Sequence, residues 1–123
     1  SLMICAMAAS YDPRTPTQDN PLGIVLPLDE QTAVLENEAW ARWMAFDPLT
    51  LVESKHQALG KLKCLFIDCG GRDQYHIQYG SRRIIERLKS MDIPHIWEEF
   101  DGTHSGIDFR LDLSFAQLSK DLS

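Results

Sequence analysis

The feature that most constrains this chain is a change of hydrophobic period between residues 62 and 106. Residues 64–69 form a short, mostly apolar run, as expected of a strand buried on both faces, and two glycines end it. From residue 77 the apolar side chains recur every three or four positions, which predicts a helix. A proline then opens a second strand-like run at residues 94–100. This order predicts a strand–helix–strand unit, whose right-handed crossover brings both strand ends to one edge of a parallel sheet.

An acid and a histidine follow the two predicted strand ends. Asp73 comes just after the glycine break, and His104 comes just after the Asp-Gly that ends the second run. Because both strand ends meet at one edge, we expect these side chains to be neighbours. Imidazole accepts and returns a proton near neutral pH, and a carboxylate on its second nitrogen fixes its tautomer. The pair therefore predicts a catalytic couple, with Asp73 as the orienting acid and His104 as the base.

Two other aspartates compete for the role of the acid. Asp68 lies within the predicted strand and is less free to reach out of a crevice at the sheet edge. Asp101 is too close in sequence to His104 to support it from a different strand. A histidine in a turn is more often an ordinary surface residue, but the acid-bearing turn upstream favours the catalytic interpretation here.

The residues after the acid are candidates for a substrate pocket. Tyr75 and His76 follow Asp73 directly, although an exposed helix start would explain them equally well. The remaining histidines, His56 and His95, have no partners at the spacing of zinc ligands. We therefore expect neither a metal nor an organic cofactor.

The acid and histidine motifs resemble those of α/β-hydrolases of the putative-esterase family, which includes esterase D. In that family a strand ending in Gly-x-x-Asp supplies the acid of the catalytic triad, and a later Gly-x-x-His or Gly-x-His turn supplies the base. Residues 70–73 (Gly-Gly-Arg-Asp) and 102–105 (Gly-Thr-His-Ser) match these motifs. The resemblance covers roughly residues 1–123, with specific motifs only in the second half. It implies a serine carboxylic-ester hydrolase in which Asp73 and His104 are two members of the triad.

The third member, the nucleophile, has no candidate in this sequence. The fold presents its serine in a Gly-x-Ser-x-Gly elbow, and none of the nine serines has those flanking glycines. A complete α/β-hydrolase also needs roughly 200 residues or more, whereas this chain has 123. We therefore expect the C-terminal portion of a longer enzyme, inactive alone, whose exposed sheet edge favours homo-oligomers.

The fold class predicted is α/β, a partial α/β-hydrolase with a mostly parallel sheet of about three strands covered by helices. Residues 1–123 are expected to form a single partial domain. Residues 2–9 are apolar and fit the third strand, a helix being the alternative for so short a run. Residues 27–60 are a helical lid or a plain cover for the sheet. Residues 62–123 hold the acid- and histidine-bearing unit and a terminal helix.

Several helix boundaries follow from capping residues. Asp29 is predicted to cap a helix that starts near residue 30, and Asp47 and Pro48 to start another that ends near residue 59. The middle helix is predicted to pack through Ile77, Ile84, Leu88 and Met91. The last helix is predicted to cover the sheet through Leu111, Phe115, Leu118 and Leu122.

Charge and cysteine content limit the class of partner. The formal net charge is −6, with acids and bases interspersed, which argues against nucleic acid and anionic membranes as partners. The resemblance to the esterase family implies a small ester as the substrate. The three cysteines lie in apolar runs without paired spacing, which indicates free thiols and a cytoplasmic location. The apolar start is too short for a membrane span and lacks the basic region of a signal peptide.

Two other functions stay open from the sequence. An acyltransferase would use the same triad and pass the acyl group to an alcohol instead of water, and acceptor choice depends on the pocket. A non-catalytic interaction module would keep the scaffold without a nucleophile.

Overall fold

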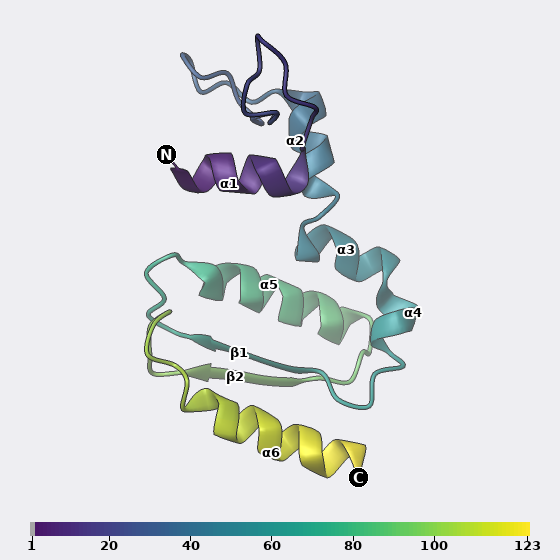
Figure 1. Cartoon of the computed structure of the whole chain (residues 1–123). Coiled ribbons are helices and arrows are strands. Elements are labelled where there is room, and N and C mark those ends of the chain that lie inside the picture. Colours follow the sequence, from purple (N-terminus) through teal and green to yellow (C-terminus); the bar gives the residue numbers. More distant parts are fainter. Residues whose placement is uncertain (1) are drawn as a thin grey trace. The chain divides into compact units, whose positions relative to one another are not determined.

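The computed structural model describes residues 2–123, which form two compact units divided between Thr50 and Leu51. The chain is a mixed α/β structure with a small two-stranded parallel sheet packed against helices (Figure 1). Its elements in order are α1 (Leu2–Tyr11), α2 (Asn37–Met44), α3 (Pro48–Ser54), α4 (His56–Leu59), β1 (Phe66–Gly70), α5 (Ile77–Ser90), β2 (Ile96–Phe100) and α6 (Arg110–Leu122). Within the described part of the chain, no helix is long and apolar enough to cross a membrane.

The second unit is built on the predicted strand–helix–strand order, which the structure confirms. Strands β1 and β2 pair in parallel, with Phe66 opposite Ile96 and Gly70 opposite Phe100. Helix α5 connects them, and α5 and α6 lie on opposite sides of the two strands (Figure 1). Both strand ends therefore meet at the same edge of the sheet.

The core of this unit lies between α5 and the sheet. Ile85 and Leu88 of α5 are buried together with Val52 and Ile93, and Ile67 of β1 packs against them. Burying an aliphatic side chain of this size contributes about 1.5–3 kcal/mol. These contacts hold α5 on the strands and so set where the turn between β1 and α5 can lie.

The face through which α5 packs is largely the predicted one. Leu88 is buried, and Ile84 and Met91 are partly buried and pack against the core. Ile77 is the exception, at 46% exposure, and Ile85, which the prediction did not include, is buried.

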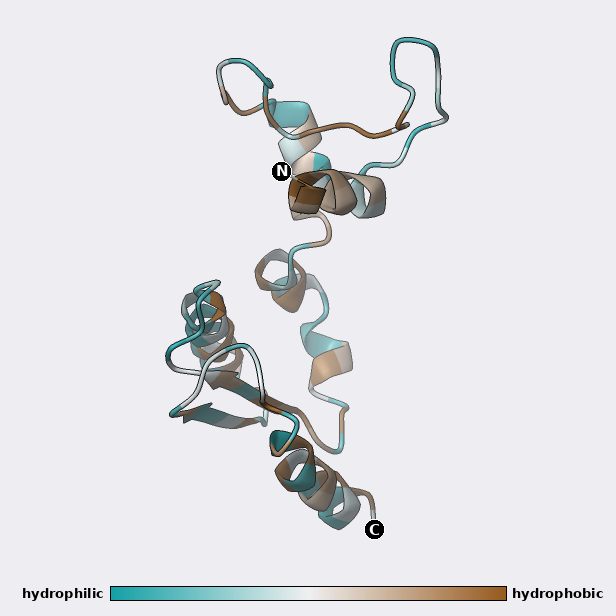
Figure 2. Cartoon of the chain, turned by 60° about the vertical axis from the view of Figure 1, so that its left-hand side comes forward, coloured by the Kyte–Doolittle hydropathy of each residue, from teal (hydrophilic) through white to brown (hydrophobic). Residues whose placement is uncertain are grey.

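The third strand predicted for residues 2–9 is wrong, because these residues belong to helix α1. The run consists largely of Leu, Met and Ala, which are strong helix formers, and it has a single β-branched residue, Ile4. Helix α1 is apolar along most of its length (Figure 2), so hydrophobic periodicity gave no signal to separate helix from strand. The sheet consequently has two strands among the described residues.

The start predicted near residue 30 for the next helix is also wrong, although the helix itself is present as α2. The Asp29 carboxylate accepts the Thr32 N–H at 2.7 Å and closes a turn, and Ala33 has a φ of 58°. A left-handed residue ends any helix that the cap could start, so α2 begins only at Asn37.

The second predicted helix start is confirmed. The Asp47 carboxylate accepts the N–H of Thr50 at 2.8 Å, and Pro48 is the first residue of α3. The helical stretch is interrupted at Lys55, so that α3 and α4 are separate helices.

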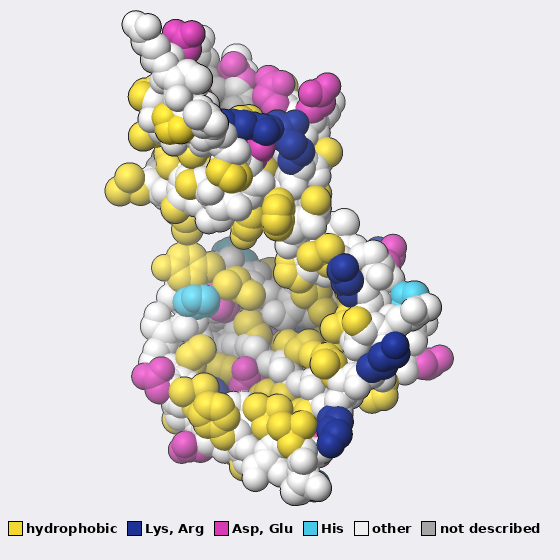
Figure 3. Space-filling view, turned by 45° about the vertical axis from the view of Figure 1, so that its right-hand side comes forward, with side chains coloured by type: hydrophobic (Ala, Val, Ile, Leu, Met, Phe, Trp, Pro, Cys, Tyr) yellow, Lys and Arg dark blue, Asp and Glu magenta, His cyan; other side chains and the backbone are white. Residues whose placement is uncertain are grey.

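Helix α6 is held by charge instead of the predicted apolar face. None of its residues is buried, and Phe115 is 62% exposed. Arg110, at its start, donates to Asp68 of β1 at 2.8 Å and to Glu98 of β2, which are opposite each other in the sheet. Its guanidinium also lies 4.6 Å from the centre of the Phe100 ring. Large hydrophobic side chains are also exposed elsewhere in the chain, and Figure 3 shows many of them at the surface.

The first unit joins α1 to α2 through a buried carboxylate. Asp12 is 4% exposed and accepts a hydrogen bond from Arg42 of α2 at 2.7 Å. It also pairs with Arg14 at 2.7 Å. Ala8, at 0% exposure, and Trp43 provide the apolar part of this contact.

The end of β1 packs so closely that only glycine fits. A Cβ atom at Gly70 would lie 2.6 Å from the carbonyl oxygens of Gly102 and Thr103, in the turn that follows β2. We expect Gly70→Ala to lower the free energy of unfolding by about 1–3 kcal/mol, because backbone atoms must move apart.

The matched control is Gly80→Ala, at a helical position where an added Cβ meets nothing within 4 Å. That variant should gain about 0.5–1 kcal/mol, the usual benefit of alanine in a helix. Urea unfolding of both variants checks the expectation, and equal stability of the two would contradict the close approach at Gly70.

Candidate active site

The two side chains predicted to be neighbours are in direct contact. His104 Nδ1 lies 2.8 Å from Asp73 Oδ2, although 31 residues separate them in sequence. Asp73 belongs to the turn between β1 and α5, and His104 to the turn after β2. The contact therefore spans the carboxyl ends of two adjacent parallel strands.

Backbone hydrogen bonds join these two turns and so position the pair. The Gly71 N–H donates to the Phe100 carbonyl at 2.8 Å, and the Arg72 N–H donates to the Gly102 carbonyl at 2.9 Å. The pairing of β1 with β2 thus continues beyond the strands, up to the residue before Asp73. His104 follows Gly102 by two positions, which places it within reach of the acid.

The Asp73 carboxylate is buried and fully engaged. Its side chain is 3% exposed, and its second oxygen, Oδ1, accepts the Tyr75 N–H at 2.7 Å. Burial alone would raise the pKa of Asp73, but the hydrogen bonds from His104 and from the Tyr75 N–H outweigh it and hold this pKa below its usual 3.8. The group is therefore an ionised acceptor at neutral pH.

The histidine has the complementary environment. Its side chain is 45% exposed, so it is open to a reacting molecule while its partner is not. Because Nδ1 is bonded to Asp73, Nε2 is the nitrogen left for proton transfer. This combination of a buried acid and an accessible imidazole is what a general base requires.

Of the two candidate pocket residues, the structure brings one to the pair. The Tyr75 ring meets the His104 ring edge-on, with centroids 4.9 Å apart, and Tyr75 is 59% exposed. The His76 ring instead lies 6.0 Å from the ring of Tyr79. His76 has a φ of 60° and precedes α5, so its backbone serves the turn.

The competing aspartates have other partners. Asp68 accepts from Arg110 at 2.8 Å. Asp101 has a side chain that is 88% exposed, and it pairs with Arg72 at 2.6 Å. Asp73 is therefore the aspartate bonded to His104.

The sequence analysis missed Gln74, which also holds the histidine. Its Oε1 accepts the backbone N–H of His104 at 3.1 Å. The only signal was its place directly after the acid, on a turn that must face the second strand end. Because Gln74 and Asp73 are adjacent, a single turn makes hydrogen bonds to both the backbone and the ring of His104.

The described residues hold no nucleophile bonded to this pair. No hydroxyl of residues 2–123 is hydrogen-bonded to His104, and the side chain of Thr103, next to it, bonds to the Ser105 carbonyl at 3.3 Å. Within the same residues no three His, Cys, Asp or Glu side chains are grouped to hold a metal ion. What the arrangement can do by itself is fix the orientation and the tautomer of an imidazole.

Comparisons with known proteins give no further guide to this site. The chain matches no protein-family model, and it has no match among curated protein sequences. The geometry of residues 70–104 is therefore the guide to function.

The lowered pKa of Asp73 predicts how stability depends on pH. The Asp73 carboxyl group binds its proton more tightly in the unfolded chain than in the folded one. Its contribution to the free energy of unfolding is therefore fully present above about pH 4, and is lost as the pH falls through the lower pKa of the folded state. We expect Asp73→Asn to be less stable than wild type at neutral pH, with a gap that narrows in acid. Urea unfolding at about pH 7 and about pH 3 measures both.

The exposed Asp101→Asn is the matched control and should show the smaller gap at neutral pH, because its ion pair is solvated. If the difference in the free energy of unfolding between wild type and Asp73→Asn stayed constant from neutral pH into acid, the lowered pKa of Asp73 would be contradicted.

The hydrogen bond from His104 to Gln74 makes a separate prediction. In Gln74→Ala the His104 amide loses its acceptor, so its hydrogen exchange should accelerate by about tenfold, the effect of roughly one neutral hydrogen bond. Gln74→Glu keeps an acceptor oxygen and should retain the protection. Exchange followed by NMR tests this, and an unchanged rate in Gln74→Ala would show that the bond contributes nothing.

Proposed function

We propose that this chain supplies the acid and the base of a serine carboxylic-ester hydrolase and represents the C-terminal part of an α/β-hydrolase fold. The observation that carries the proposal is the hydrogen bond between the buried Asp73 and the exposed His104 across the ends of β1 and β2. The order of acid before histidine is the one that this fold uses. The nucleophilic serine would come from outside these 123 residues, since no elbow motif occurs within them.

The proposed chemistry is acyl transfer through a covalent intermediate. His104 Nε2 takes the proton of the serine hydroxyl as its oxygen attacks the ester carbonyl, and then gives that proton to the departing alcohol. Water repeats the cycle on the acyl-enzyme and releases the acid. Asp73 keeps Nδ1 protonated and stabilises the imidazolium that forms in each step.

The neighbours of the pair have roles that follow from their positions. Tyr75, which touches the His104 ring and is exposed, would form one wall of the ester site. Gln74 is a positioning residue, because it holds the backbone of His104 and not its ring. His76 would line the site only at its margin, since its ring lies beside the ring of Tyr79.

The proposal includes a cellular setting. The substrate is a small ester, as the proposed acyl-transfer chemistry requires, while the net charge of −6 argues against nucleic acid and anionic membranes as partners. The described cysteines, Cys5, Cys64 and Cys69, are free, which suits a reducing cytoplasm. Each described strand has one neighbour, so β1 and β2 both offer an edge through which copies could pair.

The proposal is tested with p-nitrophenyl acetate and the longer protein that carries this chain. His104→Ala should lower kcat/KM by about 10³-fold or more, and Asp73→Asn by about 10²–10⁴-fold, because each removes part of one proton-transfer unit. The matched controls His56→Ala and Asp101→Asn change exposed residues of the same types and should keep the wild-type rate within about twofold. The 123-residue chain alone should not hydrolyse the ester.

Two measurements separate this function from its alternatives. A fluorophosphonate probe should label a serine outside residues 1–123 and fail to do so in His104→Ala. An acyltransferase would also be labelled, but would transfer the acyl group to an added alcohol faster than to water. Equal esterase rates in wild type and both variants would leave a structural role for the pair and favour the interaction module.

A further inference from the structure

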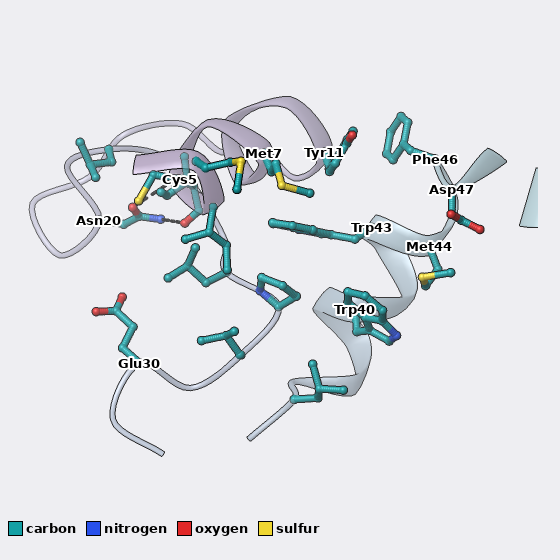
Figure 4. Close-up of a pocket in the computed structure, with 18 of the residues that line it drawn as sticks. Cys5, Met7, Tyr11, Asn20, Glu30, Trp40, Trp43, Met44, Phe46 and Asp47 are labelled. Carbon is teal, nitrogen blue, oxygen red and sulfur yellow. Dashed lines mark hydrogen bonds between the residues drawn. The ribbon is translucent and has the colours of Figure 1, made fainter. Parts of the chain in front are cut away.

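The first unit surrounds an apolar cavity of about 1270 Å³, with walls from α1, from α2 and from the loop between them (Figure 4). Its lining residue Asn20 is engaged, because its amide donates to the Ile24 carbonyl at 2.8 Å and accepts the Ile24 N–H at 3.3 Å. The indole nitrogen of Trp43 is buried and has no surface open to the cavity. The lining therefore offers apolar contact without a free buried hydrogen-bonding group that would select one ligand.

A more specific arrangement lies in the second unit, around Arg110, the first residue of α6. Its Nε donates to Asp68 Oδ2 at 2.8 Å, and a second guanidinium nitrogen donates to Glu98. The same guanidinium lies 4.6 Å from the centre of the Phe100 ring. Asp68 of β1 and Glu98 of β2 are opposite each other in the sheet, so one side chain, only 11% exposed, bridges both strands.

This bridge depends on the shape of the guanidinium group. Two carboxylates directly opposite each other in a sheet repel, unless a cation lies between them. A planar guanidinium can donate to both carboxylates at once and still stack its face on an aromatic ring. A lysine ammonium carries the same charge but lacks this planar fork, so lysine would not reproduce the bridge.

Arg110 fixes the end of the loop that carries His104. This loop spans residues 101–109, between β2 and α6. Its beginning is held by the Arg72 N–H, which donates to the Gly102 carbonyl at 2.9 Å. At its end, α6 has no side-chain N-cap and no buried residue. The start of α6 is therefore held to the strands by the charge bridge of Arg110 and not by a buried apolar face.

A similar ion pair on the other face of the sheet has a different setting. Arg82 of α5 donates to both carboxylate oxygens of Glu99, the next residue along β2. Successive strand residues point to opposite faces, so this pair lies on the side of α5. Helix α5 is also held by the buried side chains of Ile85 and Leu88. Loss of the Arg82 pair would therefore leave its helix in place.

We propose that Arg110 is a positioning residue for His104. By bridging Asp68 and Glu98 it fixes the end of the 101–109 loop, and the fixed loop keeps the imidazole against Asp73. Arg110 itself is bonded to neither His104 nor Asp73. The geometry of the loop does not depend on the proposed function, whereas the effect of Arg110 on ester hydrolysis rests on it.

The tautomer of His104 reports its contact with Asp73 in the folded 123-residue chain. At alkaline pH, where the ring is neutral, the hydrogen bond to Asp73 places the proton on Nδ1, and the ¹⁵N shifts of the ring measure the two tautomers. In Arg110→Lys the ratio of the Nδ1–H to the Nε2–H tautomer should fall about tenfold, roughly the effect of losing one hydrogen bond. A change in global stability alone would not move this ratio.

Two further variants assign the effect to the bridge. Arg82→Lys is the matched control, because it weakens a guanidinium–carboxylate pair on the same strand, and it should leave the tautomer ratio unchanged. The uncharged triple variant Asp68→Asn/Glu98→Gln/Arg110→Met removes the bridge together with the repulsion between the two carboxylates. It should shift the ratio as Arg110→Lys does, and it replaces that variant if the lysine chain does not fold.

The longer protein that carries this chain gives the catalytic readout. With p-nitrophenyl acetate, Arg110→Lys should lower kcat about tenfold and leave KM within about twofold, because a misplaced base impairs proton transfer more than ester binding. Arg82→Lys should keep both constants.

An unchanged tautomer ratio in Arg110→Lys or in the triple variant, or an equal shift in Arg82→Lys, would overturn the positioning role. A longer protein without esterase activity would instead refute the proposed function, and the ring measurement would still decide the role of Arg110.

Discussion

The second unit depends on the close approach of two turns at one edge of its sheet. Gly70 ends β1 in contact distance of the carbonyls of Gly102 and Thr103, where any side chain would collide. That approach lets the Gly71 and Arg72 N–H groups reach across to the β2 turn. Without it, the acid on one turn and the histidine on the other could not meet at 2.8 Å.

Charge pairing on the strands leaves one aspartate for the histidine. Arg110 occupies both Asp68 and Glu98, and Arg82 of α5 occupies Glu99. Hydrogen bonds to a guanidinium stabilise these carboxylates as anions and hold α6 and α5 to the strands. Asp73 does not pair with these arginines, because it lies beyond the last residue of β1. There the turn buries its side chain and places it against His104.

The sequence predicted well wherever short-range chemistry decides the structure. Gly70 and Gly71 marked the end of β1, Asp47-Pro48 marked the start of α3, and the spacing of Asp73 and His104 from their strand ends indicated that the two would meet. It failed where the choice depends on a partner surface. Residues 2–11 are apolar enough for strand or helix, and the apolar stripe of α6 has no cover among the described residues.

The sequence by itself therefore determined the order of elements in the second unit and that Asp73 and His104 would be neighbours, because turns, caps and breaks depend on adjacent residues. Only the tertiary structure decided that the Gln74 side chain accepts the backbone N–H of His104, and that Arg110 pairs with both Asp68 and Glu98. These features join residues that are far apart in sequence, and their energies come from contacts that no local pattern encodes.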